Sequence, residues 1–286
     1  MRTLVFGAKG QLGRDLVEVF HALGDVQGLD LPEVNIADEP ALYQHVDQFR
    51  PNLILNAAAY TNVEAAEDDF EAAFLTNEAG ARNVAEVADY LEVPVVYFST
   101  DYVFDGEKRA PYHEDDAVNP AGVYARSKAA GETAVRKFCH RHFIIRTAWL
   151  YGPGGNNFVE KILRAAAAKP ELAVVDDEVG APTYTRDLAE ATAALAATDA
   201  FGTYHVTNSG HCSRFECAQA ILGAAGLDIP VRPVASHAYP TRAPRPTYSV
   251  LDMARYTGAT GRRMRHWEEA LVSYVRRRDA LAGASA

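Results

Sequence analysis

The sequence predicts an α/β protein with a Rossmann-like, doubly wound parallel sheet and a smaller, discontinuous α/β substrate domain. Two observations lead to this class. In the first half, short apolar runs alternate with segments of helical length, which is typical of parallel strand–helix–strand units. These runs are apolar throughout instead of alternating with polar residues, as expected where helices cover both faces of a sheet.

The expected strands of the first half are Thr3–Phe6, Val26–Leu29, Leu53–Asn56, Val95–Phe98 and Phe143–Thr147. The helical segments between them include Gln11–Leu23, Pro40–Phe49 and Phe70–Leu91. The second half is less regular. It predicts helices at Asn157–Ala168, Arg186–Ala197, Arg214–Ala225 and around His266–Arg278, and strands at Leu172–Val175 and Gly202–Val206. A proline-rich stretch runs from Pro230 to Pro246, and its segment Pro240–Pro246 is expected to be an extended loop.

Composition places the chain among ordinary globular proteins. It has 286 residues, 48% hydrophobic and 23% charged, without an apolar segment of about 18 residues that would span a membrane. A formal charge of -10 argues against general nucleic-acid binding, which needs a basic face. The first apolar run is too short for a signal peptide, so we predict a cytoplasmic protein. The cysteines lie at no metal-binding spacing, and we interpret them as buried or incidental thiols. We interpret the arginines near the C-terminus as solvated; they are Arg262, Arg263, Arg265 and Arg276–Arg278.

A glycine-rich turn follows the first strand and opens the first helix. Gly7, Gly10 and Gly13 have the spacing G-x-x-G-x-x-G. Gly7 permits a tight turn, Gly10 lets the backbone approach a pyrophosphate, and Gly13 allows close helix–strand packing. Three glycines alone would fit a plain turn, but the strand before and the helix after favour dinucleotide binding in the short-chain reductase variant. The expected cofactor contacts of this loop are Gly7, Lys9, Gly10, Gln11, Leu12 and Gly13.

Acidic residues follow the second expected strand. Asp30 stands at its end, where a carboxylate accepts hydrogen bonds from an adenosine ribose or serves only as a turn residue. Asp38 either caps the next helix or approaches the adenine. No arginine follows Asp30 until Arg50, so an obvious clamp for a 2′-phosphate is missing, although Lys9 or Arg14 could serve. The sequence therefore predicts NADPH or NADH as the cofactor.

Tyr124 and Lys128 form a Tyr-x-x-x-Lys pair on an expected helix with Asn119 as its cap and Pro120 in its first turn. Residues four apart share one helix face. Reducing a ketone requires a proton for the nascent alkoxide, and a phenol with a pKa of about 10 is too weak an acid at neutral pH. Lowering that pKa by about 3 units takes about 4 kcal/mol, which an ammonium about 4 Å away supplies. The pair predicts a proton donor with its tuning cation; the alternative is an exposed helical Tyr and Lys.

A hydroxyl stands at the end of the fourth expected strand, in the segment Ser99–Phe104. Ligands bind at the carboxyl ends of strands in doubly wound sheets, and a hydroxyl there can orient a carbonyl group. We assign this role to Thr100 in preference to Ser99. The alternative is a hydroxyl that only caps the loop.

With these motifs in this order, the sequence resembles the dTDP-4-dehydrorhamnose reductase family of extended short-chain dehydrogenases/reductases. The resemblance runs over nearly the whole chain. Its further motifs are Asn56–Thr61, Ser99–Phe104, Val123–Lys128, Ala130–Glu132, Arg146–Tyr151, Gly155–Phe158, Gly180–Thr183 and Arg245–Pro246. It implies that NAD(P)H reduces the C4 ketone of dTDP-4-dehydro-6-deoxy-L-mannose to dTDP-L-rhamnose, for cell-wall polysaccharide or lipopolysaccharide O-antigen. Residues 1–150 plus about 172–210 would form the NAD(P)-binding domain, and about 151–171 plus 211–286 the nucleotide-sugar domain.

The resemblance also implies roles for single residues. Thr100, Tyr124 and Lys128 match the catalytic positions, where Tyr124 would protonate the C4 oxygen and Lys128 would tune it and bind the nicotinamide ribose. The segment Ala57, Ala58 and Ala59 would line the cofactor site. The residues expected to face the substrate are Thr100, Asp101, Tyr102, Trp149, Asn157 and Arg245, the last at the diphosphate or base. From the residues alone, Trp149 equally fits a core aromatic.

The chain departs from this resemblance at Tyr184-Thr185-Arg186, where several relatives carry an acidic residue involved in metal-linked pairing. The departure weakens the case for a metal-bridged dimer. We expect no catalytic metal, because hydride transfer with a tyrosine acid requires none, and we expect a monomer or a homodimer. The expected partner is the dTDP-keto sugar, with neither nucleic acid nor membrane.

Two rival functions remain. A nucleotide-sugar 4,6-dehydratase usually has Asp-Glu after the threonine, whereas Tyr102 follows Asp101 here; an epimerase on the same scaffold is not excluded by the sequence. A non-catalytic subunit, like the regulatory subunit of methionine adenosyltransferase, shares this fold. Retention of Thr100, Tyr124 and Lys128 together disfavours that role, although it does not prove turnover.

Overall fold

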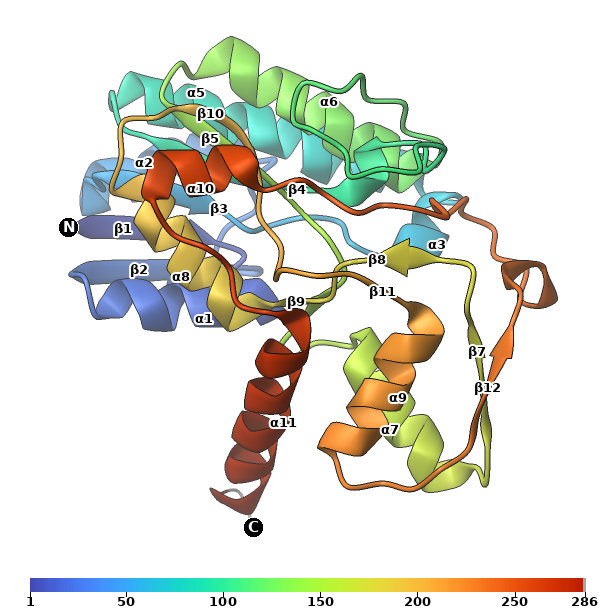
Figure 1. The fold of residues 1–286 in the computed structure, drawn as a ribbon. Helices are drawn as coiled ribbons and strands as arrows, with labels where there is room; N and C mark the ends of the chain where they lie inside the picture. Colours follow the sequence, from blue (N-terminus) through green and yellow to red (C-terminus); the bar gives the residue numbers. More distant parts are fainter. Residues whose placement is uncertain (285–286) are drawn as a thin grey trace.

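The computed structural model describes residues 1–284 and has a six-stranded parallel sheet at its centre (Figure 1). Its strand order is β10-β5-β4-β3-β1-β2. The strands are β1 (Arg2–Phe6), β2 (Asp25–Leu29), β3 (Leu53–Asn56), β4 (Val95–Thr100), β5 (His142–Thr147) and β10 (Gly202–His205). The sheet grows in opposite directions from β1, toward β2 on one side and β3 on the other. The crevice for a ligand is therefore expected where β1 and β3 end.

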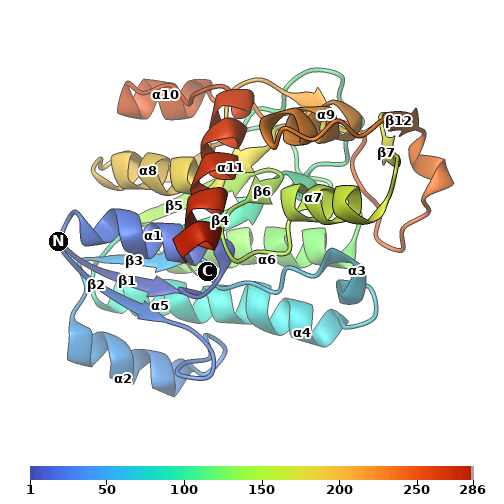
Figure 2. The ribbon, with the colours of Figure 1, turned by 90° about the horizontal axis from the view of Figure 1, so that it is seen from below.

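Helices cover both faces of this sheet, as the apolar strands predict (Figure 2). In β1, Leu4 and Phe6 pack on the side of α2 and α5, whereas Val5 packs on the side of α1 and α8. The helices of the first face are α2 (Glu39–Phe49), α5 (Ala81–Tyr90) and α6 (Val123–Phe138). Those of the second are α1 (Gln11–His21), α8 (Thr185–Ala196) and α10 (Ala254–Thr260).

Two helix boundaries differ from expectation. The expected helix Phe70–Leu91 is α4 (Phe70–Phe74), a π-helical segment η1 (Leu75–Gly80) and then α5. The helix with Tyr124 begins at Val123, not at Pro120, because the Asn119 backbone N–H donates to the Val103 carbonyl (2.8 Å) and holds this stretch in a loop. The short elements on this side are α3 (Val63–Ala66) and the 3-10 turn η2 (Asp101–Val103).

A second hydrophobic core lies beside the sheet, between α7 (Phe158–Ala168), α9 (Arg214–Ala224) and α11 (Trp267–Ala284). Pairs of short strands border it, and Figure 1 shows β7 and β12 running side by side beyond α9. The pairs are β7 (Leu172–Val175) with β12 (Val231–Val234), β8 (Val179–Gly180) with β11 (Cys212–Ser213), and β6 (Leu150–Tyr151) with β9 (Thr183–Tyr184), and η3 (Ser236–Ala238) follows β12.

This pairing bears on the domain division. We expected the chain to rejoin the large sheet from about residue 172, but β7 pairs with β12. β12 itself lies in the proline-rich stretch, where no strand was predicted. The return to the sheet begins with α8, and we propose two domains with the boundary moved accordingly.

The C-terminal arginines are not all solvated as expected. Arg277 forms an ion pair with the fully buried Asp15 of α1 (2.6 Å), and Arg265 pairs with Asp187 of α8 (2.7 Å). Arg278 pairs with Glu160 of α7 (2.8 Å). The approach to α11 and the helix itself are thereby tied to both parts of the molecule. No helix within residues 1–284 is long and apolar enough to cross a membrane.

Candidate active site

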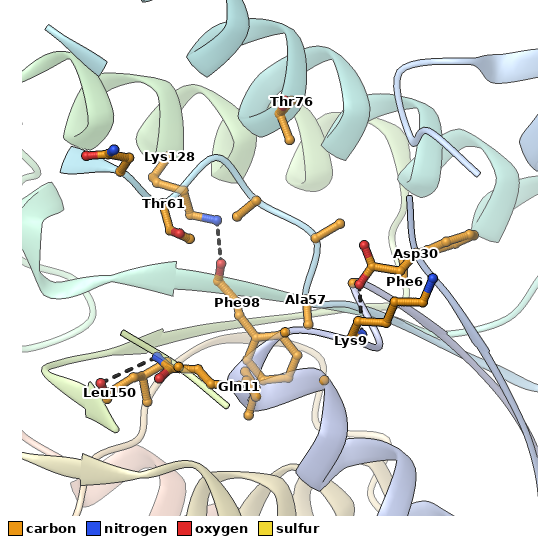
Figure 3. Close-up of a pocket in the computed structure, with 18 of the residues that line it drawn as sticks. Phe6, Lys9, Gln11, Asp30, Ala57, Thr61, Thr76, Phe98, Lys128 and Leu150 are labelled. Carbon is orange, nitrogen blue, oxygen red and sulfur yellow. Dashed lines mark hydrogen bonds between the residues drawn. The ribbon is translucent and has the colours of Figure 1, made fainter. Parts of the chain in front are cut away.

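A cavity of about 950 Å³ opens where β1 and β3 end, and it gathers residues from both halves of the chain (Figure 3). Most of the predicted site residues line it: Gly7, Lys9, Gly10, Gln11, Leu12, Gly13, Asp30, Ala57, Ala58, Ala59, Tyr124, Lys128, Asn157 and Arg245. Five predicted residues are not part of this lining: Asp38, Thr100, Asp101, Tyr102 and Trp149.

The glycine loop contributes mostly backbone to one wall of the cavity. Gly7 has a φ of +75°, and a Cβ there would lie 2.5 Å from the Ala58 nitrogen. A Cβ on Gly13 would lie 2.0 Å from the Gly7 carbonyl oxygen, so these segments touch with no room for side chains. No side chain caps the start of α1 at Gly10, which leaves the first N–H groups of the helix for an anion.

The two acidic residues after β2 differ in role. The Asp30 carboxylate accepts hydrogen bonds from the backbone nitrogens of Lys9 and Leu31, both at 2.8 Å, and it lines the cavity. Asp38 lies outside the lining and caps α2 by accepting from the Ala41 nitrogen at 3.2 Å. Of its two expected roles, the structure gives Asp38 that of a helix cap, because this loop turns its carboxylate toward α2.

Tyr124 and Lys128 lie at the start of α6, and Lys128 is only 3% exposed. The Lys128 Nζ donates to the Phe98 carbonyl oxygen at 2.6 Å, as Figure 3 shows, and lies 4.1 Å from the centre of the Tyr97 ring. Burial lowers the pKa of Lys128 to about 7, although the charge of Glu132 opposes this. An exposed helical Tyr and Lys is therefore excluded.

The electrostatics of Tyr124 correct one expectation. Lys128 was expected to lower the pKa of the phenol. Instead, burial raises the pKa of Tyr124 above its usual value, the Thr100 hydroxyl opposes the shift, and the charge of Asp101 adds to it. The reason is that Lys128 is itself buried, loses its proton readily and binds the Phe98 carbonyl. The phenol consequently keeps its proton at neutral pH.

The end of β4 contributes two hydroxyls with different partners. The Thr100 Oγ1 donates to the Asp101 carboxylate at 3.0 Å and accepts from the Tyr102 nitrogen at 3.2 Å. The Ser99 hydroxyl donates to Glu132 at 2.6 Å, and Ser99, unlike Thr100, is one of the residues that line the cavity. Burial raises the pKa of Asp101 to about 6. The Tyr102 ring meets Tyr124 edge to face with 6.2 Å between centroids, which puts the Thr100–Tyr102 segment directly behind Tyr124.

Trp149 lies in packing outside the cavity lining. The Arg214 guanidinium lies 3.4 Å from the centre of its ring, and a Cβ on Gly180 would come within 2.5 Å of the indole. It also packs against the second core, with a φ of +46°. Trp149 is half-buried, its indole lies against Gly180 of β8, and its contact with the substrate stays a prediction.

Asn157 and Arg245 close the far wall of the cavity. Asn157 caps α7 by accepting from the Glu160 nitrogen at 3.1 Å and donates to the Gly152 carbonyl at 3.0 Å. Arg245 pairs with Glu64 of α3 at 2.8 Å. Both side chains are therefore held in place at the cavity.

Sequence reasoning missed the charged pair beneath this site. Glu132, almost fully buried, binds Arg146 of β5 through two hydrogen bonds of 2.9 and 2.8 Å. Its position four residues after Lys128 places both on one face of α6, and this spacing could have revealed it. Thr147 at the end of β5 was also missed; its hydroxyl is buried, has no hydrogen-bond partner within residues 1–284, and the residue lines the cavity. The strand-end argument that selected Thr100 applies equally to Thr147.

The chain is similar in sequence to a known protein family and to individual reductases. Residues 1–279 match the family described as RmlD substrate binding domain. The dTDP-4-dehydrorhamnose reductase of Streptomyces griseus is 40% identical over 279 residues, covering 95% of this chain and 92% of the relative. A dTDP-4-keto-6-deoxy-D-glucose reductase of Streptomyces niveus is also 40% identical, over 276 residues and 95% of each chain.

A solved structure matches over the same extent. The dTDP-4-dehydrorhamnose reductase of Bacillus anthracis str. Ames, crystallised in complex with NADP, has a TM-score of 0.93 and 38% identity. The match covers 96% of this chain and 98% of that one. The similarity in sequence and in fold therefore extends over both the central sheet and the second core.

Proposed function

Because this chain belongs to the RmlD substrate binding domain family, we propose that it reduces the C4 ketone of dTDP-4-dehydrorhamnose to dTDP-L-rhamnose with NADPH or NADH. The observation that carries this proposal is that Tyr124 and Lys128 line the same cavity as the glycine loop. The relatives named as reductases of dTDP-linked keto sugars support the substrate class. The cytoplasmic location and the monomeric or dimeric state stay predictions.

The residues present fit a dinucleotide. The glycine loop has no space for a Cβ at Gly7 or Gly13, and its helix N-terminus has no side-chain cap. Its N–H groups would hold the pyrophosphate, Asp30 the adenosine ribose, and Lys128 the nicotinamide ribose. When bound, the reduced nicotinamide supplies the hydride for the C4 carbon.

The side chains of α6 and β4 would manage the proton. Tyr124, whose pKa is raised by burial, is protonated at neutral pH and donates to the C4 oxygen. Thr100, which already contacts Asp101 and the Tyr102 backbone, orients the carbonyl through Tyr124. Lys128, with a pKa lowered to about 7, can return a proton to this buried site. Arg245 and Asn157 would face the nucleotide-sugar end of the cavity.

The site argues against one rival function, and the assay separates the other two. Asp101 is followed by Tyr102, which packs on Tyr124, so the acid–base pair of a dehydratase is incomplete. An epimerase would interconvert two hydroxy epimers of a nucleotide sugar without net consumption of the cofactor. A non-catalytic subunit would bind NADPH and leave the sugar unchanged.

The experiment is to follow NADPH and NADH oxidation at 340 nm with the keto sugar generated in place, and to identify the product by NMR. Consumption that yields dTDP-L-rhamnose is the expected result. A product with the D-configuration at C5 would assign the activity named for the Streptomyces niveus relative instead. Folded protein that binds the cofactor but consumes none would contradict the proposal.

A further inference from the structure

The edge of the cavity next to Asp30 holds one lysine between two carboxylates. The Lys9 Nζ donates to both carboxylate oxygens of Glu33 at 2.8 Å and to the Leu31 carbonyl at 3.2 Å. The backbone nitrogen of Lys9 donates to Asp30 at 2.8 Å, as Figure 3 shows. Lys9, Asp30 and Leu31 line the cavity, whereas Glu33 acts on Lys9 from outside the lining.

Arg14 does not replace Lys9 there. Its Nε donates to the Lys9 carbonyl at 2.9 Å, and its guanidinium packs against Gly154 in the loop before α7. The lining segment from Leu29 to Ile36 contains no lysine or arginine. The charges gathered at this edge are therefore one positive and two negative.

We propose that Glu33 sets the cofactor preference of this chain toward NADH by holding the Lys9 ammonium away from the adenosine ribose. This inference rests on the proposed function. A 2′-phosphate carries a charge of about −1.5 to −2 and is bound where a cation is free to meet it. Here the cation is shared with Glu33, and Asp30 adds a second negative charge.

A ribose 2′-hydroxyl suits the same place. Each Asp30 oxygen accepts one backbone hydrogen bond and keeps a further lone pair, so the carboxylate can accept from a hydroxyl donor. Glu33 affects only the phosphate, because it neutralises Lys9 and contributes nothing to the lining. The Lys9–Glu33 pair is more than half exposed on both sides, so its effect on binding is modest.

The test is the dissociation constant of NADH and of NADPH, measured by fluorescence titration without substrate, for the wild type and Glu33→Gln. We expect the wild type to bind NADH more tightly. Glu33→Gln should tighten NADPH about fivefold and change NADH by less than about twofold. The tighter binding of NADPH that Glu33→Gln produces should be absent in the double variant Lys9→Met/Glu33→Gln.

Asp47→Asn is the matched control, because Asp47 forms an exposed pair with Arg50 at 3.1 Å on α2, away from the cavity. It should change neither constant. Tighter binding of NADPH by the wild type, or equal shifts of both cofactors in Glu33→Gln, would overturn the inference alone. A wild type that binds neither cofactor would overturn the proposed function with it.

Discussion

The two walls of the cavity are built in different ways. The cofactor wall is mostly backbone, with Gly7, Gly13 and Ala58 in direct contact and the exposed Lys9–Glu33 pair at its edge. The catalytic wall consists of buried side chains from separate segments, and ionisable groups such as Lys128 lie inside it. The cofactor wall therefore depends on shape, whereas the catalytic wall depends on charges that burial has altered.

The first way to test this contrast is to remove the charge beneath the catalytic wall. Glu132→Gln leaves Arg146 buried without its carboxylate, and we expect a loss of about 3–5 kcal/mol in the free energy of unfolding. Urea unfolding measures it. Glu190→Gln, which breaks an exposed pair with Arg186, is the control and should cost less than about 1 kcal/mol. Equal losses of unfolding free energy in the two variants would show that the buried pair stabilises the protein no more than the exposed pair does.

The same pair gives a pH dependence. Burial alone would raise the pKa of Glu132, but Arg146 and Ser99 bring it below its usual value of 4.5. The stabilisation is therefore complete above about pH 4.5 and is lost as the pH falls through the lower folded-state pKa. The difference between wild type and Glu132→Gln should shrink on acidification.

Lys128 gives the second test. Burial shifts its pKa, whereas the partners of Glu132 shift the pKa of that carboxyl. Burial lowers its pKa from 10.5 to about 7, so between these values the unfolded chain binds more protons and stability rises with pH. Between pH 7 and 9.5 we expect about 3 kcal/mol of this rise to disappear in Lys128→Met. Lys137→Met, on an exposed turn of α6, should keep the wild-type slope. A Lys128→Met slope like that of the wild type would place the ammonium in solvent.

The smallest expected effect concerns the cap of α2, which lies outside the cofactor wall. Asp38→Ala removes the cap of α2 and should cost about 1 kcal/mol of stability while leaving the NADPH dissociation constant unchanged. Thermal unfolding and fluorescence titration measure the two quantities. Weaker NADPH binding by Asp38→Ala would show that Asp38 contacts the cofactor.

The sequence predicted the cofactor wall better than the catalytic wall. The strands and the glycine loop follow from periodicity and local spacing, because a turn between a strand and a helix is fixed by neighbouring residues. The position of Tyr124 and Lys128 on one helix face was predicted for the same reason. The direction of the Tyr124 pKa shift was wrong, since burial depends on segments far along the chain.

Three other features were not predicted for the same reason, because they depend on segments far apart in the chain. The surroundings of Trp149 could not be predicted, because Arg214 and Gly180 reach its ring from distant segments of the chain. The Arg277–Asp15 pair joins residues at opposite ends of the chain, and no local pattern predicts it. β7 resembled a strand of the large sheet because its partner β12 lies in a stretch dominated by prolines.

The most direct test of this account is Tyr124→Phe, measured for both NADPH affinity and turnover of the keto sugar. Phenylalanine keeps the ring that packs against Tyr102 and removes only the proton donor. We expect the dissociation constant to stay within about twofold and turnover to fall about 10²–10⁴-fold, while Tyr90→Phe on the surface changes neither. Near-normal turnover by Tyr124→Phe would contradict the account, because the proton would then come from another group.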